Sequence, residues 1–142
     1  MGLDKEQMKV ANALTIAKEY YDEATYNHAI RVMQYVADNS LISYEYKDEC
    51  VALAVMHDLL EDTEYTGSGL PDRFYKALQL LTRKKDQTYT EYIKNIKDTG
   101  YTNWRMCAYW VKLADIKDHL AQIETLTDSL KERYIKALTI LL

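Results

Sequence analysis

The stretch Cys50-Val-Ala-Leu-Ala-Val-Met56 is the most hydrophobic run of the chain, and the polar run His57-Asp-Leu-Leu-Glu-Asp62 follows it directly. The apolar run is too short to cross a membrane and contains neither Gly nor Pro. We therefore expect a buried helix over about Lys47 to Leu60, which ends in a group of charged side chains.

Helical periodicity continues on both sides of this stretch. The whole chain of 142 residues has one Pro and four Gly, which leaves little material for turns. No internal repeat or linker interrupts it. We therefore predict an all-α fold of about seven helices in one domain spanning residues 1–142. The predicted helices cover about 3–21, a segment from Thr25 or Tyr26 onward, 47–60, a segment from Pro71 onward, 88–97, 103–122 and 127–142.

Turn and capping signals mark several of these boundaries. A loop is expected at Thr66-Gly-Ser-Gly69, and Gly100 is a plausible helix stop. The last helix is expected to begin near Thr127 to Ser129, with Glu132 placed for a capping box. The segment over 103–122 places Trp104, Cys107, Val111 and Asp115 on one line, which predicts that Asp115 faces the core.

Composition and charge limit the function classes. The net charge is −4 and no basic stripe is present, which argues against nucleic-acid binding. No apolar run reaches ~18 residues and no leader-like segment opens the chain, so neither a membrane span nor export is predicted. Cys50 and Cys107 fall in apolar helical runs and are interpreted as buried thiols rather than a disulfide, which suits the cytoplasm.

The charged end of the central helix is the first unusual feature. His57 and Glu61 are i,i+4 neighbours, and so are Asp58 and Asp62. The helix dipole disfavours anions at a helix C-terminus, and like charges at this spacing repel. A divalent metal would turn these penalties into attractions, whereas the alternative is a solvated helix end. Because unpaired buried charge is costly, the metal site is the favoured interpretation.

Two further residues extend this candidate site. Asp115 is predicted to face the core, where Lys112, one turn earlier, could be a plain salt-bridge partner. His28 shares a helix face with Val32 and Val36, and it could equally be a hydrogen-bonded core histidine. Mixed histidine and carboxylate ligands suit Mn²⁺, Fe²⁺ or Zn²⁺ better than Mg²⁺ or Ca²⁺.

In this order, His28, then His57-Asp58, then Asp115, the residues resemble the H…HD…D pattern of HD-domain phosphohydrolases. The similarity spans about residues 10–140. The hydrolase domain of the RelA/SpoT group, which removes the 3′-pyrophosphate of guanosine tetraphosphate, is the closest match. Three stretches carry this closer resemblance: His57-Asp-Leu-Leu-Glu-Asp-Thr63, Leu81-Thr-Arg-Lys84 and Lys112-Leu-Ala-Asp115.

The resemblance implies a cytoplasmic hydrolase of a small phosphorylated, nucleotide-like substrate with one divalent metal, Mn²⁺ being the first choice. It makes His28, His57, Asp58 and Asp115 the metal ligands. Glu61 and Asp62 become the catalytic pair that orients and deprotonates the attacking water. Candidate substrate contacts are Arg31, Lys112, His119, Arg83 and Tyr92; for the basic side chains among them, ordinary surface charge is the alternative.

Two departures from the RelA/SpoT pattern keep other substrates open. The stretch before His28, Glu19-Tyr-Tyr-Asp-Glu-Ala-Thr-Tyr-Asn27, is acidic where that group has a basic, glycine-containing segment. His119 stands where that group commonly has Asn. The alternatives are an HD hydrolase of another phosphate compound and a nucleotide-binding regulatory domain without turnover. A di-iron oxygenase is disfavoured because no histidine lies between His57 and His119.

Overall fold

The computed structural model describes residues 7–98 and 105–142, and within them every regular element is helical. The first three helices are α1 (Val10–Tyr20), α2 (Glu23–Ala37) and α3 (Lys47–Met56), and α3 is preceded by a 3-10 turn, η2 (Tyr44–Tyr46). The others are α4 (Leu59–Asp62), α5 (Asp72–Leu80), α6 (Tyr89–Asp98), α7 (Arg105–Ala121) and α8 (Asp128–Leu141). The predicted all-α class is confirmed, with the third predicted helix divided into α3 and α4.

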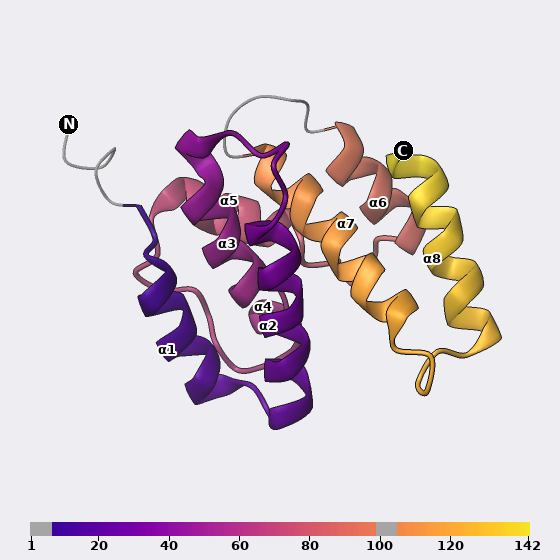
Figure 1. Ribbon diagram of the computed structural model, residues 1–142, viewed down its shortest axis with the longest axis horizontal. Coiled ribbons are helices and arrows are strands. Elements are labelled where there is room, and N and C mark those ends of the chain that lie inside the picture. The colour runs from indigo at the N-terminus through magenta and orange to yellow at the C-terminus, as the bar shows by residue number, and fades with distance from the viewer. Residues whose placement is uncertain (1–6, 99–104) are drawn as a thin grey trace.

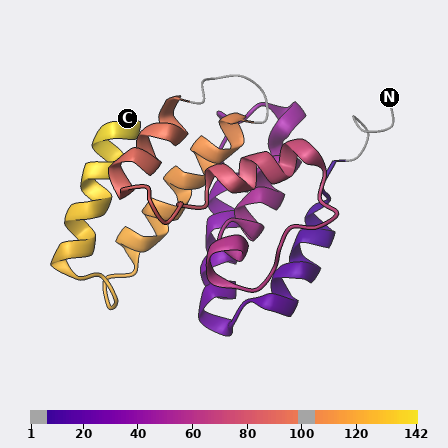
Figure 2. The same cartoon turned by 180° about the vertical axis from the view of Figure 1, so that it is seen from behind.

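Helix α3 lies at the centre of the fold, because every residue from Glu49 to Met56 is buried. A helix that is apolar on all sides must be surrounded, and α1, α2, α5 and α7 pack around it. Helix α7 lies between α1, α2 and α3 on one side and α8 on the other (Figure 1). Helices α6 and α8 lie side by side at the other end of the molecule (Figures 1 and 2). One continuous hydrophobic core includes residues from all eight α-helices of the described chain.

Local side-chain hydrogen bonds fix several helix starts. The Asp22 carboxylate caps α2 by accepting the backbone N–H of Thr25 at 2.8 Å. Thr88 and Glu91 form a reciprocal capping box at the start of α6, with N···O distances of 2.8 and 3.1 Å. The predicted loop at 66–69 is also present, and Gly67 adopts a φ of 80° there.

Four expectations from the sequence need correction or fall outside the structure. Helix α1 begins at Val10 rather than near Leu3, although residues 3–6 lie outside the described chain. The cap of α8 is Thr127, whose hydroxyl accepts from Leu130 N–H, so the capping box with Glu132 is wrong. The capping box would need its acidic residue at position 130, so Glu132 lies two positions too far along, and it pairs instead with Lys136. Gly100 and Trp104 lie outside the described residues.

The prediction that the two cysteines are unpaired thiols is wrong. Cys50 on α3 and Cys107 on α7 form a disulfide, with their Cα atoms 4.8 Å apart. Both were correctly expected to be buried, but the sequence could not indicate that the two apolar runs place them opposite each other. The pairing removes the cysteines as support for a reducing compartment, so the cytoplasmic location stays a prediction.

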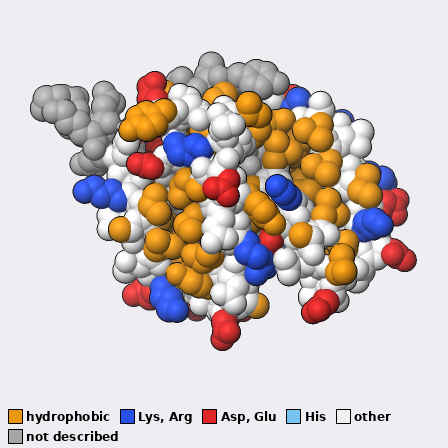
Figure 3. All heavy atoms as spheres, viewed as in Figure 1, with side chains coloured by type: hydrophobic (Ala, Val, Ile, Leu, Met, Phe, Trp, Pro, Cys, Tyr) orange, Lys and Arg blue, Asp and Glu red, His pale blue; other side chains and the backbone are white. Residues whose placement is uncertain are grey.

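The surface drawn in Figure 3 mixes Lys, Arg, Asp and Glu side chains with exposed hydrophobic ones. No helix of the described chain combines the length and the apolar character that a bilayer crossing requires. Among the residues that the structure describes, this face (Figure 3) has no patch of a single charge that would indicate a binding surface.

Candidate metal centre

The structure brings the four predicted ligands together from three separate parts of the chain. His28 lies on α2, His57 and Asp58 lie in the turn after α3, and Asp115 lies on α7. One nitrogen or oxygen atom of each side chain lies within 4.8 Å of the corresponding atom of every other. Ligand bonds of about 2.0–2.2 Å allow opposite ligands roughly 4.4 Å apart, so only small adjustments would close this group around one ion.

The Oδ1 atom of Asp115 is the centre of this group. It lies 2.8 Å from Nε2 of His28 and 3.1 Å from Nε2 of His57. The Asp58 carboxylate lies 3.2 Å from the same His57 nitrogen. Two imidazole nitrogens and two carboxylate oxygens thus lie close enough together to surround one ion.

The far side of each imidazole is held as metal-ligating histidines usually are. His28 Nδ1 lies 2.6 Å from Oδ2 of Asp118, and His57 Nδ1 lies 2.6 Å from the carbonyl oxygen of Ala54. Both partners are hydrogen-bond acceptors, so each Nδ1 donates its N–H and each Nε2 is directed at the cluster. The donor set and its outer hydrogen bonds therefore fit a bound transition-metal ion.

Asp118 is the residue of the centre that sequence reasoning missed. It is fully buried, and it accepts from Nε and Nη2 of Arg31 at 2.8 and 3.1 Å as well as from His28. The signal was available in the spacing. Asp118 follows Asp115 by three residues on α7, as Arg31 follows His28 by three on α2, so the two pairs face each other. Arg31, expected to contact substrate, is engaged in holding Asp118.

Tyr21 is a second positioning residue that the sequence did not indicate. Its buried hydroxyl donates to the carbonyl oxygen of Val55 and accepts the backbone N–H of Asp58, both at 3.1 Å. Meanwhile the Ala54 carbonyl, which would accept from Asp58 in a continuous helix, accepts from His57 instead. These replacements of helical hydrogen bonds explain why α3 ends at Met56, and they fix the turn that carries two of the predicted ligands.

Without a cation, the cluster is held together by opposite charges. Burial alone would lower the pKa of His57, but the Asp58 and Asp115 carboxylates outweigh it and raise that pKa well above its usual value. The pKa of His28 is raised in the same way, with Asp115 as the main partner opposing burial. Burial would raise the pKa of Asp115, yet Lys112 and the surrounding histidines hold it well below its usual value.

Lys112 and His119 flank Asp115 on α7. Lys112 is buried and donates to Oδ2 of Asp115 at 2.9 Å, which leaves Oδ1 for the cluster. Nε2 of His119 lies 3.2 Å from Oδ1, and its ring stacks on Tyr134 of α8 with ring centres 5.0 Å apart. His119 thus lies next to the cluster and is held by an aromatic neighbour.

A cavity of about 510 Å³ opens over the cluster. Asp58 and Asp115 lie in its lining, together with the predicted catalytic pair Glu61 and Asp62. Glu61 Oε1 accepts the backbone N–H of Arg83 at 3.0 Å, which ties it to the loop before α6. Burial and the charges of Asp58 and Glu61 raise the pKa of Asp62 to about 6.

The same cavity collects positive charge from several elements. Of the predicted substrate contacts, Lys112, His119, Arg83 and Tyr92 line it, whereas Arg31 is not among the lining residues. Arg133 and Tyr134 of α8 also line it, and sequence reasoning missed both. No local pattern marks them, because α8 meets the cavity only through its packing on α6 and α7. The other cations in the lining are Lys84 and Lys85.

Comparison of the sequence with models of known protein families finds no match, and comparison with curated proteins finds no significant relative. The likeness to HD-domain phosphohydrolases therefore rests on the motif residues quoted above.

Proposed function

We propose that this protein is a metal-dependent phosphohydrolase that cleaves a phosphate ester or anhydride in a small nucleotide-like compound. The observation that supports it most is the convergence of His28, His57, Asp58 and Asp115, with both imidazole Nε2 atoms directed at the cluster. The open cavity above them adds two carboxylates that do not belong to the ligand set. A purely structural metal site is closed and has no use for such an opening.

The chain's own residues supply the other parts that phosphate hydrolysis needs. A divalent ion held here would lower the pKa of a bound water and neutralise charge on a phosphoryl oxygen. Glu61 and Asp62 orient the attacking water and accept its proton. Arg83, Lys112 and Arg133 line the same cavity and balance the charge of the phosphate groups. Mn²⁺ is the first candidate ion, and Fe²⁺ and Zn²⁺ are the alternatives.

The specific substrate we propose is guanosine tetraphosphate, cleaved at its 3′-pyrophosphate, on the strength of the RelA/SpoT resemblance. The five cations in the cavity lining suit a substrate with several phosphate groups. The alternatives are another phosphate compound cleaved at the same site, and a regulatory domain that binds a nucleotide without turning it over.

The test is a hydrolysis screen of the Mn²⁺-loaded protein against guanosine tetraphosphate, ordinary nucleotides and simple phosphate esters. Glu61→Gln keeps an oxygen acceptor for Arg83 N–H but cannot take a proton, so we expect a rate loss of about 100-fold or more with metal retained. Glu64→Gln, a nearby exposed glutamate outside the cavity lining, is the matched control.

Each result of this screen would support a different one of the three possibilities. Release of pyrophosphate from guanosine tetraphosphate, lost in Glu61→Gln and kept in Glu64→Gln, would support the specific proposal. Turnover of another compound alone would keep the hydrolase and change its substrate. Bound metal with no turnover of anything in the screen would favour the regulatory domain.

A further inference from the structure

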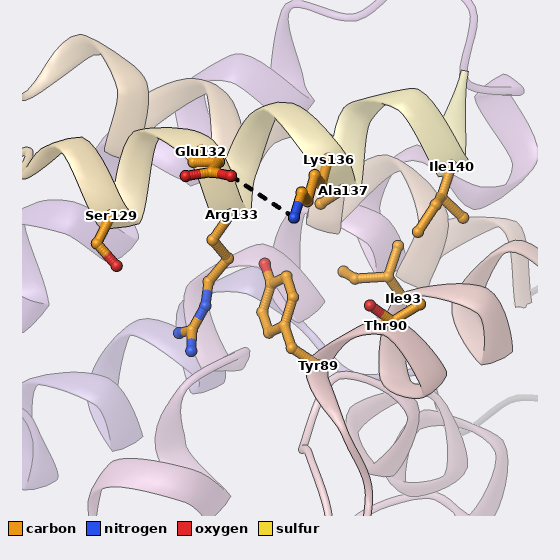
Figure 4. Close-up of a pocket in the computed structure, with 9 residues that line it drawn as sticks. All are labelled: Tyr89, Thr90, Ile93, Ser129, Glu132, Arg133, Lys136, Ala137 and Ile140. Atoms are coloured by element: carbon orange, nitrogen blue, oxygen red, sulfur yellow. Dashed lines mark ion pairs between the residues drawn. The ribbon is translucent and has the colours of Figure 1, made fainter.

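A second cavity, of about 340 Å³, lies between α6 and α8 (Figure 4). Its apolar part is formed by Ile93, Ala137 and Ile140. Hydroxyl groups and charged side chains form the remainder, including Thr90 of α6 and Glu132 of α8. The cavity therefore offers apolar surface together with hydrogen-bonding groups, a combination typical of small-molecule sites.

This cavity adjoins the one over the metal cluster, because Tyr89 and Arg133 line both. The Arg133 guanidinium carbon lies 4.7 Å from the centre of the Tyr89 ring, and Figure 4 shows the two side chains next to each other. Lys112, which binds Asp115, has its ammonium nitrogen 5.8 Å from the same ring centre. A ligand with a phosphate at the metal cluster could therefore extend past Tyr89 into the second cavity.

The hydroxyl of Tyr89 is buried and has no hydrogen-bond partner in the protein. Its neighbour Tyr92 shows the usual arrangement, since its hydroxyl donates to the carbonyl oxygen of Leu81 at 2.7 Å. A buried hydroxyl without a partner is unfavourable and calls for an explanation. Figure 4 shows the Tyr89 hydroxyl directed toward α8, at the edge of the second cavity.

We propose that the cavity between α6 and α8 binds the nucleoside part of the substrate, and that the Tyr89 hydroxyl hydrogen-bonds to it. This inference rests on the proposed function, since it assumes that the reacting phosphate lies at the metal cluster. Under this inference, the cavity between α6 and α8 recognises the end of the substrate that does not react.

The lining favours a base and sugar over a further phosphate group. A heteroaromatic ring has apolar faces, which would pack on Ile93, Ala137 and Ile140, and a polar edge, which would meet the hydroxyls at the rim. A phosphate in the same place would lie on apolar surface, and the Lys136 ammonium of this cavity already pairs with the Glu132 carboxylate at 3.6 Å. The strongest cationic lining belongs to the other cavity, where the phosphates are expected.

The first test compares Tyr89→Phe with Tyr92→Phe. Tyr89→Phe removes a hydroxyl that has no partner, so the free protein should keep its thermal stability, whereas Tyr92→Phe should lose stability because it leaves the Leu81 carbonyl unpaired. For Tyr89→Phe we expect about three- to tenfold weaker binding of a nucleoside diphosphate and unchanged binding of inorganic pyrophosphate. Equal binding of the nucleoside diphosphate by wild type and Tyr89→Phe would overturn the assigned role of this hydroxyl.

The second test fills the cavity. Thr90 is exposed on α6 and lines the cavity, so Thr90→Trp should block it without disturbing the core; Asn95→Trp, also exposed on α6 but outside this lining, is the matched control. The probes are the four common nucleoside diphosphates and inorganic pyrophosphate, titrated by calorimetry into Mn²⁺-loaded protein. We expect the best nucleoside diphosphate to bind at least about tenfold more tightly than pyrophosphate, and Thr90→Trp to abolish that difference.

The outcomes separate this inference from the proposed function. If the protein hydrolyses a phosphate compound and binds pyrophosphate, but no nucleoside diphosphate binds more tightly, the nucleoside site is overturned and the hydrolase stands. The same holds if Thr90→Trp and Asn95→Trp behave alike. If neither pyrophosphate nor any nucleotide binds and nothing is hydrolysed, the proposed function fails and this inference fails with it.

Discussion

The two sides of the main cavity differ in how completely their polar groups are paired. On the side of the metal cluster, His28, His57, Asp115 and Asp118 are buried, and each makes at least two hydrogen bonds or ion pairs. On the side formed by α6 and α8, Tyr89 has a buried hydroxyl without a partner. The polar groups of the first side are thus paired with one another, whereas the second side has a buried polar group that no protein atom satisfies.

The two sides also differ in how their helices are joined. The disulfide links α3 and α7 seven residues before His57 and eight residues before Asp115, so it lies about two turns from the cluster on both helices. No disulfide joins α6 to α8, since both cysteines of the chain are used in this bond. Helix α7, which carries Asp115, is thus covalently linked to α3, which leads into His57 and Asp58, whereas α6 and α8 are held together by non-covalent contacts alone.

The largest effect is expected from removing this disulfide. It closes a loop of 57 residues, so the variant Cys50→Ala/Cys107→Ala should lose roughly 4 kcal/mol of unfolding free energy. Chemical denaturation of both proteins under non-reducing conditions measures it. Rapid alkylation of both cysteines in denatured, unreduced wild-type protein would show that the bond is absent.

The next effect concerns Asp118, which orients His28. Asp118→Asn removes the charge that holds the His28 Nδ1 proton and pairs with Arg31, so metal affinity should fall about 10- to 100-fold. Competition with a metal-binding dye measures this, and Asp128→Asn, an exposed aspartate in the first turn of α8, is the control. Unchanged affinity in Asp118→Asn would contradict the role assigned to the Asp118 charge in orienting His28.

A smaller effect is expected from pH. The pKa values of His28 and His57 in the metal-free protein lie above the 6.5 of the unfolded chain. Protonation of these histidines therefore stabilises the metal-free fold below pH 6.5, and this stabilisation is lost as pH rises through the folded-state pKa values. Because a metal ion binds only neutral imidazole, its affinity should increase over the same range.

Thermal unfolding with and without Mn²⁺ tests this expectation. The increase in melting temperature that the metal causes should be larger near pH 8 than near pH 6. An increase that does not change with pH would contradict the assignment of the two histidines as ligands.

The sequence was sufficient to predict the helical class and the convergence of the four predicted ligands, the first from short-range periodicity and the second from the motif resemblance. His57 and Asp58 are adjacent, and the burial of His28 and Asp115 followed from the apolar residues on their helix faces. The Cys50–Cys107 bond, the role of Tyr21 and the approach of Arg133 to the cavity were not predicted. These depend on how distant helices pack, which no local spacing encodes.

For Arg31 the sequence predicted the location correctly but not the partner. Its position three residues after His28 correctly indicated that it lies near the site, and charge alone favoured a phosphate partner. The structure pairs it instead with Asp118, a carboxylate on another helix. The spacing on each helix offers this pairing, but choosing Asp118 over a substrate phosphate required the knowledge that α2 and α7 pack against each other, which comes from the fold.

The central claim is that His28, His57, Asp58 and Asp115 bind one metal ion. The most direct measurement is elemental analysis of the protein after saturation with Mn²⁺ and removal of unbound metal, for wild type, Asp58→Ala and the exposed control Asp72→Ala. We expect about one ion per chain in wild type and Asp72→Ala, and about 100-fold weaker binding or none in Asp58→Ala. Failure of wild type to bind Mn²⁺, Fe²⁺ or Zn²⁺, or full occupancy in Asp58→Ala, would contradict the account.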